Sequence, residues 1–430
     1  MIQATNELIL GIDLQEEYTQ VTYYHKSVRE PLTLSITPQE NQPLLPMAVR
    51  QDAEGIWHFW NGEPETEENE DKKDRVRISG IYQKMTEGKP VPTGDGEMKM
   101  QELLAVYFGL CFRLPGILTQ NARMHVMVTV KELTEELNAL LNQALAQAGI
   151  EPDNIYLQDH LSSFFFYTVN QKKELWYQDV ALLEYENQEM VGYVLHIDSS
   201  TRPAIARVEK AAVQPVNEEV RAGRSEDEWK KEKDRLFFEL LKKVFERRNV
   251  SVSYLMGDFY SKSWAQRSIQ FLCYKRHAFQ GKNLYSKGAC YAAMERAGLT
   301  AGKGVIFGGR DMVQVNLGME MRIRGKENYY PLVNAGVNWY EAKHVCELIP
   351  RGEKQIRILS TPMTQGETVE HLLRLPGLPE RPDRATRLRL AVTFTSPGTC
   401  RIQVEDLGFG GLYKSSGLKW SREIDLGGRG

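Results

Sequence analysis

The chain has 430 residues, a hydrophobic fraction of 42% and a formal net charge of −3 at pH 7. This length exceeds what one ordinary hydrophobic core supports, so two or three domains are expected. The slightly acidic balance gives no reason to expect a nucleic-acid partner, and no apolar run is long and uncharged enough to predict a membrane span. Five dispersed cysteines without a CxxC pair are typical of reduced thiols, and the N-terminus has no signal-peptide pattern. We therefore expect a cytoplasmic protein that is not associated with membranes.

Two stretches of similar pattern organise the first 300 residues: ELILGIDLQEEYTQVTYY (7–24) and DVALLEYENQEMVGYVLHID (179–198). Each has an apolar run, a short polar turn and a second apolar run, which predicts a β-hairpin. In the first stretch, Gly11-Ile12-Asp13 puts a carboxylate at the end of the incoming strand. A carboxylate in that position is suited to holding Mg²⁺-bound water beside a phosphate.

Strand and helix patterns alternate between and after the two hairpins. Apolar spacing predicts helices from about residue 98 to 111, over 133–149, from 226 to 249 behind a capping Ser225, and over 263–272 and 282–299. Strands are expected at 125–130, 155–157, 204–208, 213–216 and 252–257. The last helix contains small residues that permit close packing. This alternation favours an α/β domain.

After the stretch GKGVIFGG (302–309), helix signals stop and short alternating segments take over. They lie at 355–359, 370–373, 387–394 and 400–404, with proline and glycine between them. Several short strands separated by turn residues predict a β-sandwich. We therefore expect a first domain over residues 1–300 and an all-β domain over residues 301–430.

Several of these motifs resemble a known family. GID in a first hairpin, a second hairpin midway, a strand ending in Gly257 and the stretch KGACYAA (287–293) are similar to the actin-like ATPases. They look most like the nucleotide-binding domain of the DnaK-type 70-kDa heat-shock chaperones. Downstream, VNLGME (315–320), LPGLP (375–379) and the segments 388–394 and 401–406 follow the order of that family's peptide-binding β-domain.

The resemblance implies a fold, a site and a cofactor. The fold would be an α/β actin-like (ribonuclease-H-like) two-lobed domain with a truncated second lobe, followed by a β-sandwich without the chaperones' helical lid. The cofactor would be ATP or ADP with magnesium. The nucleotide-binding residues would be Gly11, Asp13, Gln15, Glu184, Gly257 and Asp258. Asp13 is the candidate metal- or phosphate-side carboxylate.

This chain departs from the family where phosphate chemistry needs glycine. The family's Gly-Thr-Thr in the first loop is replaced by Gln15-Glu16-Glu17, and the second hairpin turn has no glycine. Two carboxylates would repel a triphosphate, and the glycines that let a backbone approach phosphates are lost. No histidine, cysteine and carboxylate spacing predicts a metal site, and we interpret His160 as structural. We therefore expect an inactive or very weak ATPase.

The predicted function is a chaperone-related module that binds a polypeptide or protein partner and has a degenerate nucleotide site. The alternatives are an active chaperone ATPase or small-molecule kinase with a rewired phosphate site, or an actin-like self-assembling scaffold. Candidate peptide-binding residues are Met319, Met321, Tyr329, Tyr330 and Trp339, because methionine and aromatic side chains suit adaptable apolar pockets. The same residues could instead fill the sandwich core.

Overall fold

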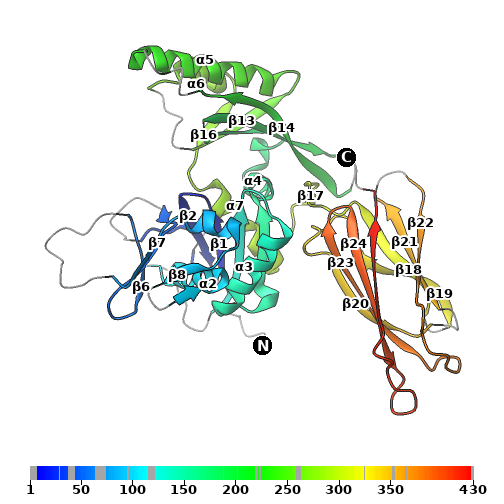
Figure 1. Cartoon of the computed structure of the whole chain (residues 1–430). Coiled ribbons are helices and arrows are strands. Elements are labelled where there is room, and N and C mark those ends of the chain that lie inside the picture. Colours follow the sequence, from blue (N-terminus) through cyan, green and yellow to red (C-terminus); the bar gives the residue numbers. More distant parts are fainter. Residues whose placement is uncertain are drawn as a thin grey trace. The chain divides into compact units, whose positions relative to one another are not determined.

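The computed structural model describes residues 7–28, 30–36, 44–62, 74–93, 96–114, 122–186, 188–200, 202–217, 221, 224–257, 263–323, 325–350, 354–363 and 366–427. The chain divides into two compact units, Met1–Ile306 and Phe307–Gly430. The expected boundary after residue 300 lies six residues before this division. Each unit is described separately below (Figure 1).

The first predicted hairpin is confirmed as β1 (Glu7–Leu14) and β2 (Tyr18–His25), which pair antiparallel. On its other side β1 pairs in parallel with β10 (Arg123–Val130), which pairs in parallel with β11 (Ile155–Asp159). The sheet order is β11-β10-β1-β2-β3, with β4 also on β2. The two short strands are β3 (Leu32–Thr33) and β4 (Leu45–Pro46). β1 is apolar and almost wholly buried, as expected for a central strand.

The second predicted hairpin is confirmed as β12 (Asp179–Glu186) and β13 (Glu189–Asp198). It lies in a separate sheet with the order β16-β15-β12-β13-β14-β17. The other strands are β14 (Ala204–Pro215), β15 (Val250–Met256), β16 (His277–Gln280) and β17 (Val305–Phe307). As in the first sheet, the first hairpin strand pairs in parallel with a later strand, here β15, and the second strand pairs antiparallel with the next one.

Seven α-helices are found among the described residues of the first unit. They are α1 (Ile81–Glu87), α2 (Met100–Cys111), α3 (Glu135–Gln147), α4 (His160–Val169), α5 (Glu226–Phe245), α6 (Gln266–Cys273) and α7 (Leu284–Arg296). α5 begins at the predicted cap, where Ser225 and Glu228 form a capping box. Its apolar face packs on the second sheet, and α6 lies beside it (Figure 1).

Smaller elements complete the first unit. A three-stranded sheet joins β6, β5 and β7, and a two-stranded ribbon joins β8 and β9. Their bounds are β5 (Val49–Gln51), β6 (Trp57–Phe59), β7 (Val76–Ile78), β8 (Val91–Thr93) and β9 (Gly96–Met98). Two 3-10 turns, η2 (Pro152–Asn154) and η3 (Lys173–Leu175), lie in connections.

The predicted α/β actin-like (ribonuclease-H-like) fold class is wrong. Strand makes up about 43% of the structure and helix about 24%, so the protein belongs to a mostly-β class. An α/β fold alternates strands with helices through parallel crossovers. Here both large sheets are mixed, with parallel pairs on one side of the hairpin and antiparallel pairs on the other. The second unit has strands only among its described elements. Sequence patterns located α2, α3, α5, α6 and α7 but not α1 or α4, and they underestimated how often one strand follows another.

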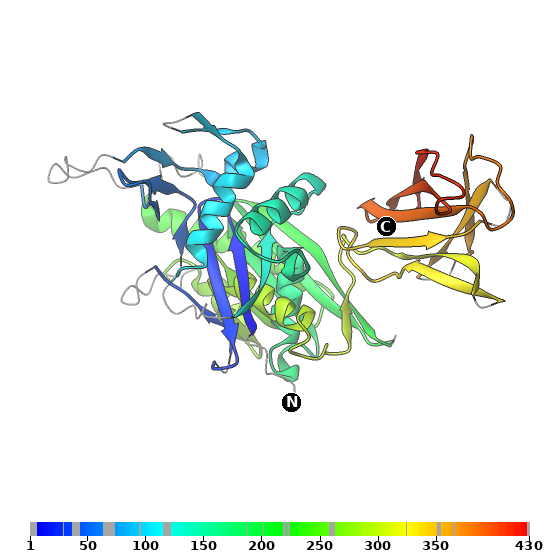
Figure 2. The same ribbon diagram turned by 90° about the horizontal axis from the view of Figure 1, so that it is seen from below.

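The second unit consists of two four-stranded antiparallel sheets, ordered β19-β18-β21-β22 and β20-β23-β24-β25 (Figures 1 and 2). Their bounds are β18 (Val315–Ile323), β19 (Lys326–Val333), β20 (Lys343–Leu348), β21 (Gln355–Pro362), β22 (Val369–Arg374), β23 (Arg387–Ser396), β24 (Thr399–Gly408) and β25 (Lys419–Asp425). Alternate residues of these strands share one apolar core, which is the packing of a β-sandwich.

A side-chain contact bridges the two sheets on each open side of this sandwich. On one side, Arg422 of β25 donates to the Leu372 carbonyl of β22. On the other side, the Tyr330 hydroxyl of β19 lies 3.3 Å from His344 Nε2 of β20. Pro331 within β19 also lacks a backbone N–H. Such features reduce the tendency of edge strands to pair with other chains.

Candidate functional site

Four side chains from four elements meet in the interior of the first unit. Asp13 lies near the end of β1 and Glu184 near the end of β12, so each comes from the first strand of one hairpin. His160 is the first residue of α4, and Tyr285 lies in the first turn of α7. We call Asp13, His160, Tyr285 and Glu184 the buried polar chain.

Direct contacts link these four residues in order. His160 Nε2 donates a hydrogen bond to Asp13 Oδ1 at 2.8 Å. The imidazole stacks on the Tyr285 ring, with centroids 4.0 Å apart and planes 11° from parallel. The Tyr285 hydroxyl then donates to Glu184 Oε1. The buried polar chain therefore connects the carboxylates of the two sheets.

Both oxygens of the Asp13 carboxylate are engaged inside the protein. Asp13 is 0% exposed, and its second oxygen, Oδ2, accepts a hydrogen bond from Gln15 Nε2 at 2.7 Å. Glu184 and His160 are each 7% exposed, and Tyr285 is 1% exposed. Buried polar groups of this kind must be paired to offset their lost hydration. Here the pairing is internal to the protein.

Burial and neighbouring charges together shift the pKa values of His160 and Glu184. Burial alone would lower the pKa of His160, but the adjacent Asp13 carboxylate raises it above its ordinary value. Burial, reinforced by repulsion from Glu186, raises the pKa of Glu184 to about 7. A carboxyl that holds its proton near neutral pH can exchange hydrogen bonds with Tyr285 as pH changes.

Helix α7 packs closely on β1 and α4 because glycines allow the backbones to approach. A Cβ atom on Gly11 of β1 would lie 2.3 Å from the Ser286 carbonyl oxygen and 2.4 Å from the Cys290 nitrogen. A Cβ atom on Gly288 would lie 2.0 Å from the Ser163 carbonyl oxygen of α4. Thr22 Oγ1 of β2 also donates to Ser286 Oγ at 2.8 Å. The small residues predicted to permit close helix packing therefore seat α7 against β1 and α4.

Comparison with known protein families gives two adjoining matches. Residues 30–310 match the family of unknown function DUF5716, C-terminal part, and residues 312–426 match a domain of unknown function, DUF8552. The first match covers more than half of the chain. The protein belongs to the DUF5716 family. No curated protein matches the chain.

The structure of this DUF5716 protein brings together only some of the predicted nucleotide-binding residues. Asp13, Gln15 and Glu184 lie in or beside the buried polar chain, whereas Gly11 lies beneath α7. Gly257 has a φ of 91° and packs against the Tyr185 carbonyl, so its freedom from a Cβ serves backbone packing. Asp258 lies outside the described residues.

The predicted peptide-binding residues of this DUF5716 protein separate into three groups. Met319 and Trp339 are 3% and 5% exposed and belong to the sandwich core. Met321 and Tyr330 are partly buried against that core. Tyr329 alone among the five is exposed, at 47%, and its ring covers Gly318. These five side chains therefore do not form one surface.

Sequence reasoning missed Tyr285, which has no distinguishing neighbours in the stretch KNLYSKGACYAA. His160 was interpreted as structural, and in the structure it joins Asp13 to Tyr285 through a hydrogen bond and a ring stack. Among the residues that the structure describes, no three histidine, cysteine or acidic side chains are grouped to hold a metal ion. None of the described helices has the length and apolar character needed to cross a membrane.

Proposed function

We propose that this DUF5716 protein is a polypeptide- or partner-binding module that does not turn over ATP and is related to the DnaK-type chaperones. The observation that carries the proposal is the state of Asp13. Its carboxylate is wholly buried, and His160 and Gln15 occupy both of its oxygens. A metal-side carboxylate needs an open coordination position and room for phosphate.

The turn beside Asp13 supports the same proposal. Glu16 and Glu17 are exposed in the connection between β1 and β2, where a phosphate-binding loop needs N–H donors and no negative charge. At the other hairpin, Tyr285 engages Glu184. Nucleotide entry would require the buried polar chain to separate and leave charged groups unpaired.

The binding half of the proposal is supported by apolar side chains on the surface of the sandwich unit. Leu412 is 88% exposed, Val345 64% and Val369 52%. Burying these side chains against a partner would remove their apolar surface from water. The proposal includes a cytoplasmic location, which the five free cysteines support.

The nucleotide half is tested by calorimetric titration of the full chain with ATP and Mg²⁺, together with a phosphate-release assay. We expect no turnover above background in the wild type, and the same result for Asp13→Ala and for Asp179→Ala, a control at an exposed pair. Steady phosphate release that disappears only in Asp13→Ala would contradict the proposal. It would instead establish an active ATPase or kinase.

The binding half is tested by incubating the full chain with an array of labelled peptides of apolar, acidic, basic and mixed composition. We expect saturable binding to a subset of the peptides that does not change when ATP is added. Sedimentation of the protein alone is measured in parallel. Binding to no peptide, together with growth into large oligomers, would contradict the proposal and favour a self-assembling scaffold.

A further inference from the structure

Strand β14 has an outer edge that is only partly covered. Its inner edge pairs with β13 over ten residue pairs, from Glu189 opposite Pro215 to Asp198 opposite Ile205. Its outer neighbour β17 has only three residues, and Ala204 N at the start of β14 donates to the Gly304 carbonyl. Among the described residues, no strand covers the outer edge from about Val208 to Gln214. An uncovered edge offers N–H and C=O groups to an added strand.

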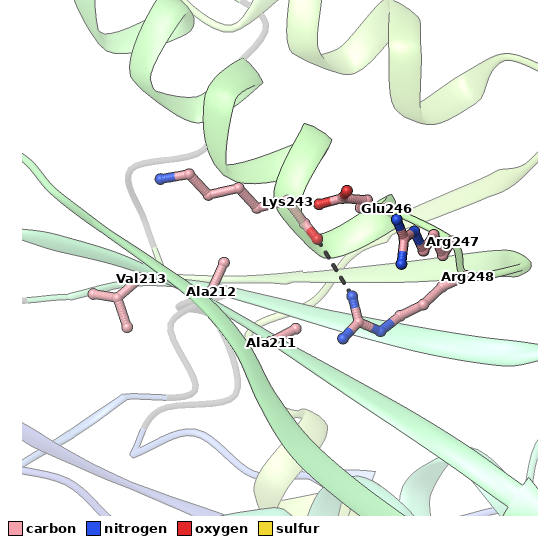
Figure 3. A pocket seen from close by; sticks show the side chains of 7 residues that line it. All are labelled: Ala211, Ala212, Val213, Lys243, Glu246, Arg247 and Arg248. Atoms are coloured by element: carbon pink, nitrogen blue, oxygen red, sulfur yellow. Dashed lines mark hydrogen bonds between the residues drawn. The ribbon is translucent and has the colours of Figure 1, made fainter.

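A groove runs beside this part of β14. Its volume is about 530 Å³, and Ala211, Ala212 and Val213 line one side of it. The other side is the C-terminal end of α5 and the residues that follow, as Figure 3 shows. These are Lys243, Glu246, Arg247 and Arg248. Small side chains on the strand leave room for the side chains of a neighbouring strand.

The groove and the strand edge carry an excess of positive charge. Arg248 is paired with Glu209 of β14 at 2.7 Å and donates to the Lys243 and Val244 carbonyls. In the described part of the chain, no carboxylate lies within 4 Å of the charged groups of Lys210, Lys243 or Arg247. With Glu209 and Glu246 counted against Lys210, Lys243, Arg247 and Arg248, the patch has a net charge of +2 on a chain whose net charge is −3. It is electrostatically complementary to an acidic partner.

Arg247 adopts a backbone conformation that favours glycine. Its φ is 56°, in the left-handed region, just after the end of α5. Glycine is the usual residue in this position because it has no Cβ to strain. An arginine therefore occupies a position where glycine would suit the fold better, and strained residues gather at functional sites.

We propose that the outer edge of β14 binds an extended polypeptide segment with acidic side chains by strand addition. The main chain of the segment pairs with β14 from about Val208 to Gln214, and its carboxylates meet Lys243 and Arg247. This inference rests on the proposed function and names its partner and its site. In the sandwich a side-chain contact bridges the two sheets on each open side, whereas the basic groups here lie beside the edge of β14.

The test measures fluorescence anisotropy of labelled nonapeptides with the full chain. The probes are alternating glutamate–valine, lysine–valine and threonine–valine peptides, and a glutamate–valine peptide N-methylated at alternate residues. We expect binding of the unmodified acidic peptide alone, and weaker binding as salt rises. Loss of binding on N-methylation separates strand addition from attraction between charges, because the methylated peptide keeps its carboxylates but loses N–H donors.

Two variants test the groove, and a matched neighbour controls for them. Combining Arg247→Gly with Lys243→Gln should weaken acidic-peptide binding by about tenfold or more. Lys242→Gln should leave affinity unchanged, because Lys242 is adjacent on α5 but pairs with Glu239 and does not line the groove. Arg247→Gly should not lower the melting temperature, because glycine fits the left-handed conformation.

Several outcomes would overturn this inference. Equal binding of the three charge types, undiminished binding of the N-methylated peptide, or no effect of the groove variants would each do so. A dimer that the same variants dissociate would also overturn it, by placing a second copy on the edge. If the peptide array finds binders but the acidic nonapeptide does not bind, the inference fails and the proposed function stands. If no peptide of any class binds, the proposed function itself fails.

Discussion

Two histidine–aspartate pairs of almost equal length lie in opposite surroundings. His160 and Asp13 are 2.8 Å apart in the interior, whereas His196 and Asp179 are 2.7 Å apart with the His196 side chain 67% exposed. An exposed pair is screened by water, and its removal has little effect on stability. A buried carboxylate that loses its partner stays dehydrated and unpaired. The same substitution should therefore have very different effects in the two places.

We expect His160→Ala to lower the free energy of unfolding by about 3–5 kcal/mol, because it leaves Asp13 buried without its main partner. The matched control His196→Ala should change it by less than about 1 kcal/mol. Urea denaturation followed by circular dichroism measures both. Equal, small losses of unfolding free energy in the two variants would mean that burying Asp13 does not require its hydrogen bond with His160.

The raised pKa of Glu184 makes folding stability depend on pH in a definite direction. Its pKa is raised on folding from an ordinary 4.5 to about 7. Between these two pKa values, the native state holds a proton that the unfolded chain has released. The contribution of Glu184 to folding stability is therefore present below about pH 4.5 and is lost as pH rises toward 7. The raised pKa of His160 acts in the same direction at higher pH.

Replacing Glu184 by Gln should remove this dependence. Between pH 4.5 and 7, stability of Glu184→Gln should fall less with rising pH than that of the wild type. Glu239→Gln, on the exposed face of α5, should follow the wild-type curve. Unfolding curves at several pH values measure the difference, and parallel curves for Glu184→Gln and wild type would contradict the assignment.

Among the elements, helix α7 has the strictest packing requirement. It lies against β1 through Gly11 and against α4 through Gly288, at distances that leave no space for one carbon atom. The sequence predicted a helix rich in small residues here, and that prediction is confirmed. Periodicity cannot show which neighbours such a helix approaches, since that depends on segments far away in the chain.

Gly288→Ala should destabilise the protein by about 2 kcal/mol or more, because the added methyl group forces α4 and α7 apart. Gly109→Ala on α2 is the control. Its Cβ would be 3.7 Å from Arg113 Nη2, so the change should be neutral or stabilising by up to about 1 kcal/mol. Thermal unfolding compares the two. If Gly288→Ala leaves the melting temperature unchanged, α4 and α7 can move apart without loss of stability.

The sequence predicted the hairpins, the long helices and four of the eight strands of the sandwich, because each has a local pattern of apolar spacing or capping. The fold class was wrong because strand content depends on pairing between segments, which local patterns do not report. The pairing of Asp13 with His160 joins residues 147 apart in sequence, and that of Tyr285 with Glu184 joins residues 101 apart. Contacts of this kind have no local signature.

At the scale of the whole molecule, the two units have separate cores and separate polar anchors. In the second unit, Asp406 is 0% exposed and accepts two hydrogen bonds from Arg381, at 2.8 and 2.7 Å. Ser416 and the Gly408 backbone also donate to it. These partners hold the pKa of Asp406 well below its ordinary value. Its contribution to stability is present near neutral pH and is lost in acid.

Arg381→Ala should therefore destabilise the second unit by about 3–5 kcal/mol and leave the first unit unchanged. Arg401→Ala, which breaks an exposed pair with Glu423, should cost less than about 1 kcal/mol. Hydrogen exchange read by mass spectrometry reports the two units separately. Faster exchange spread equally over both units would show that they unfold as one.

The position of α7 also determines when the first sheet can be covered during synthesis. The hydrogen bond from Thr22 to Ser286 can form only after Ser286 has been synthesised, 264 residues later in the chain. At ribosomal rates of about 5–20 residues per second, that interval is roughly 10–50 seconds. Throughout it, the apolar strand β1 lacks the helix that covers it. During this interval the apolar surface of β1 can associate with other chains. Slow codons before residue 284 would lengthen the interval.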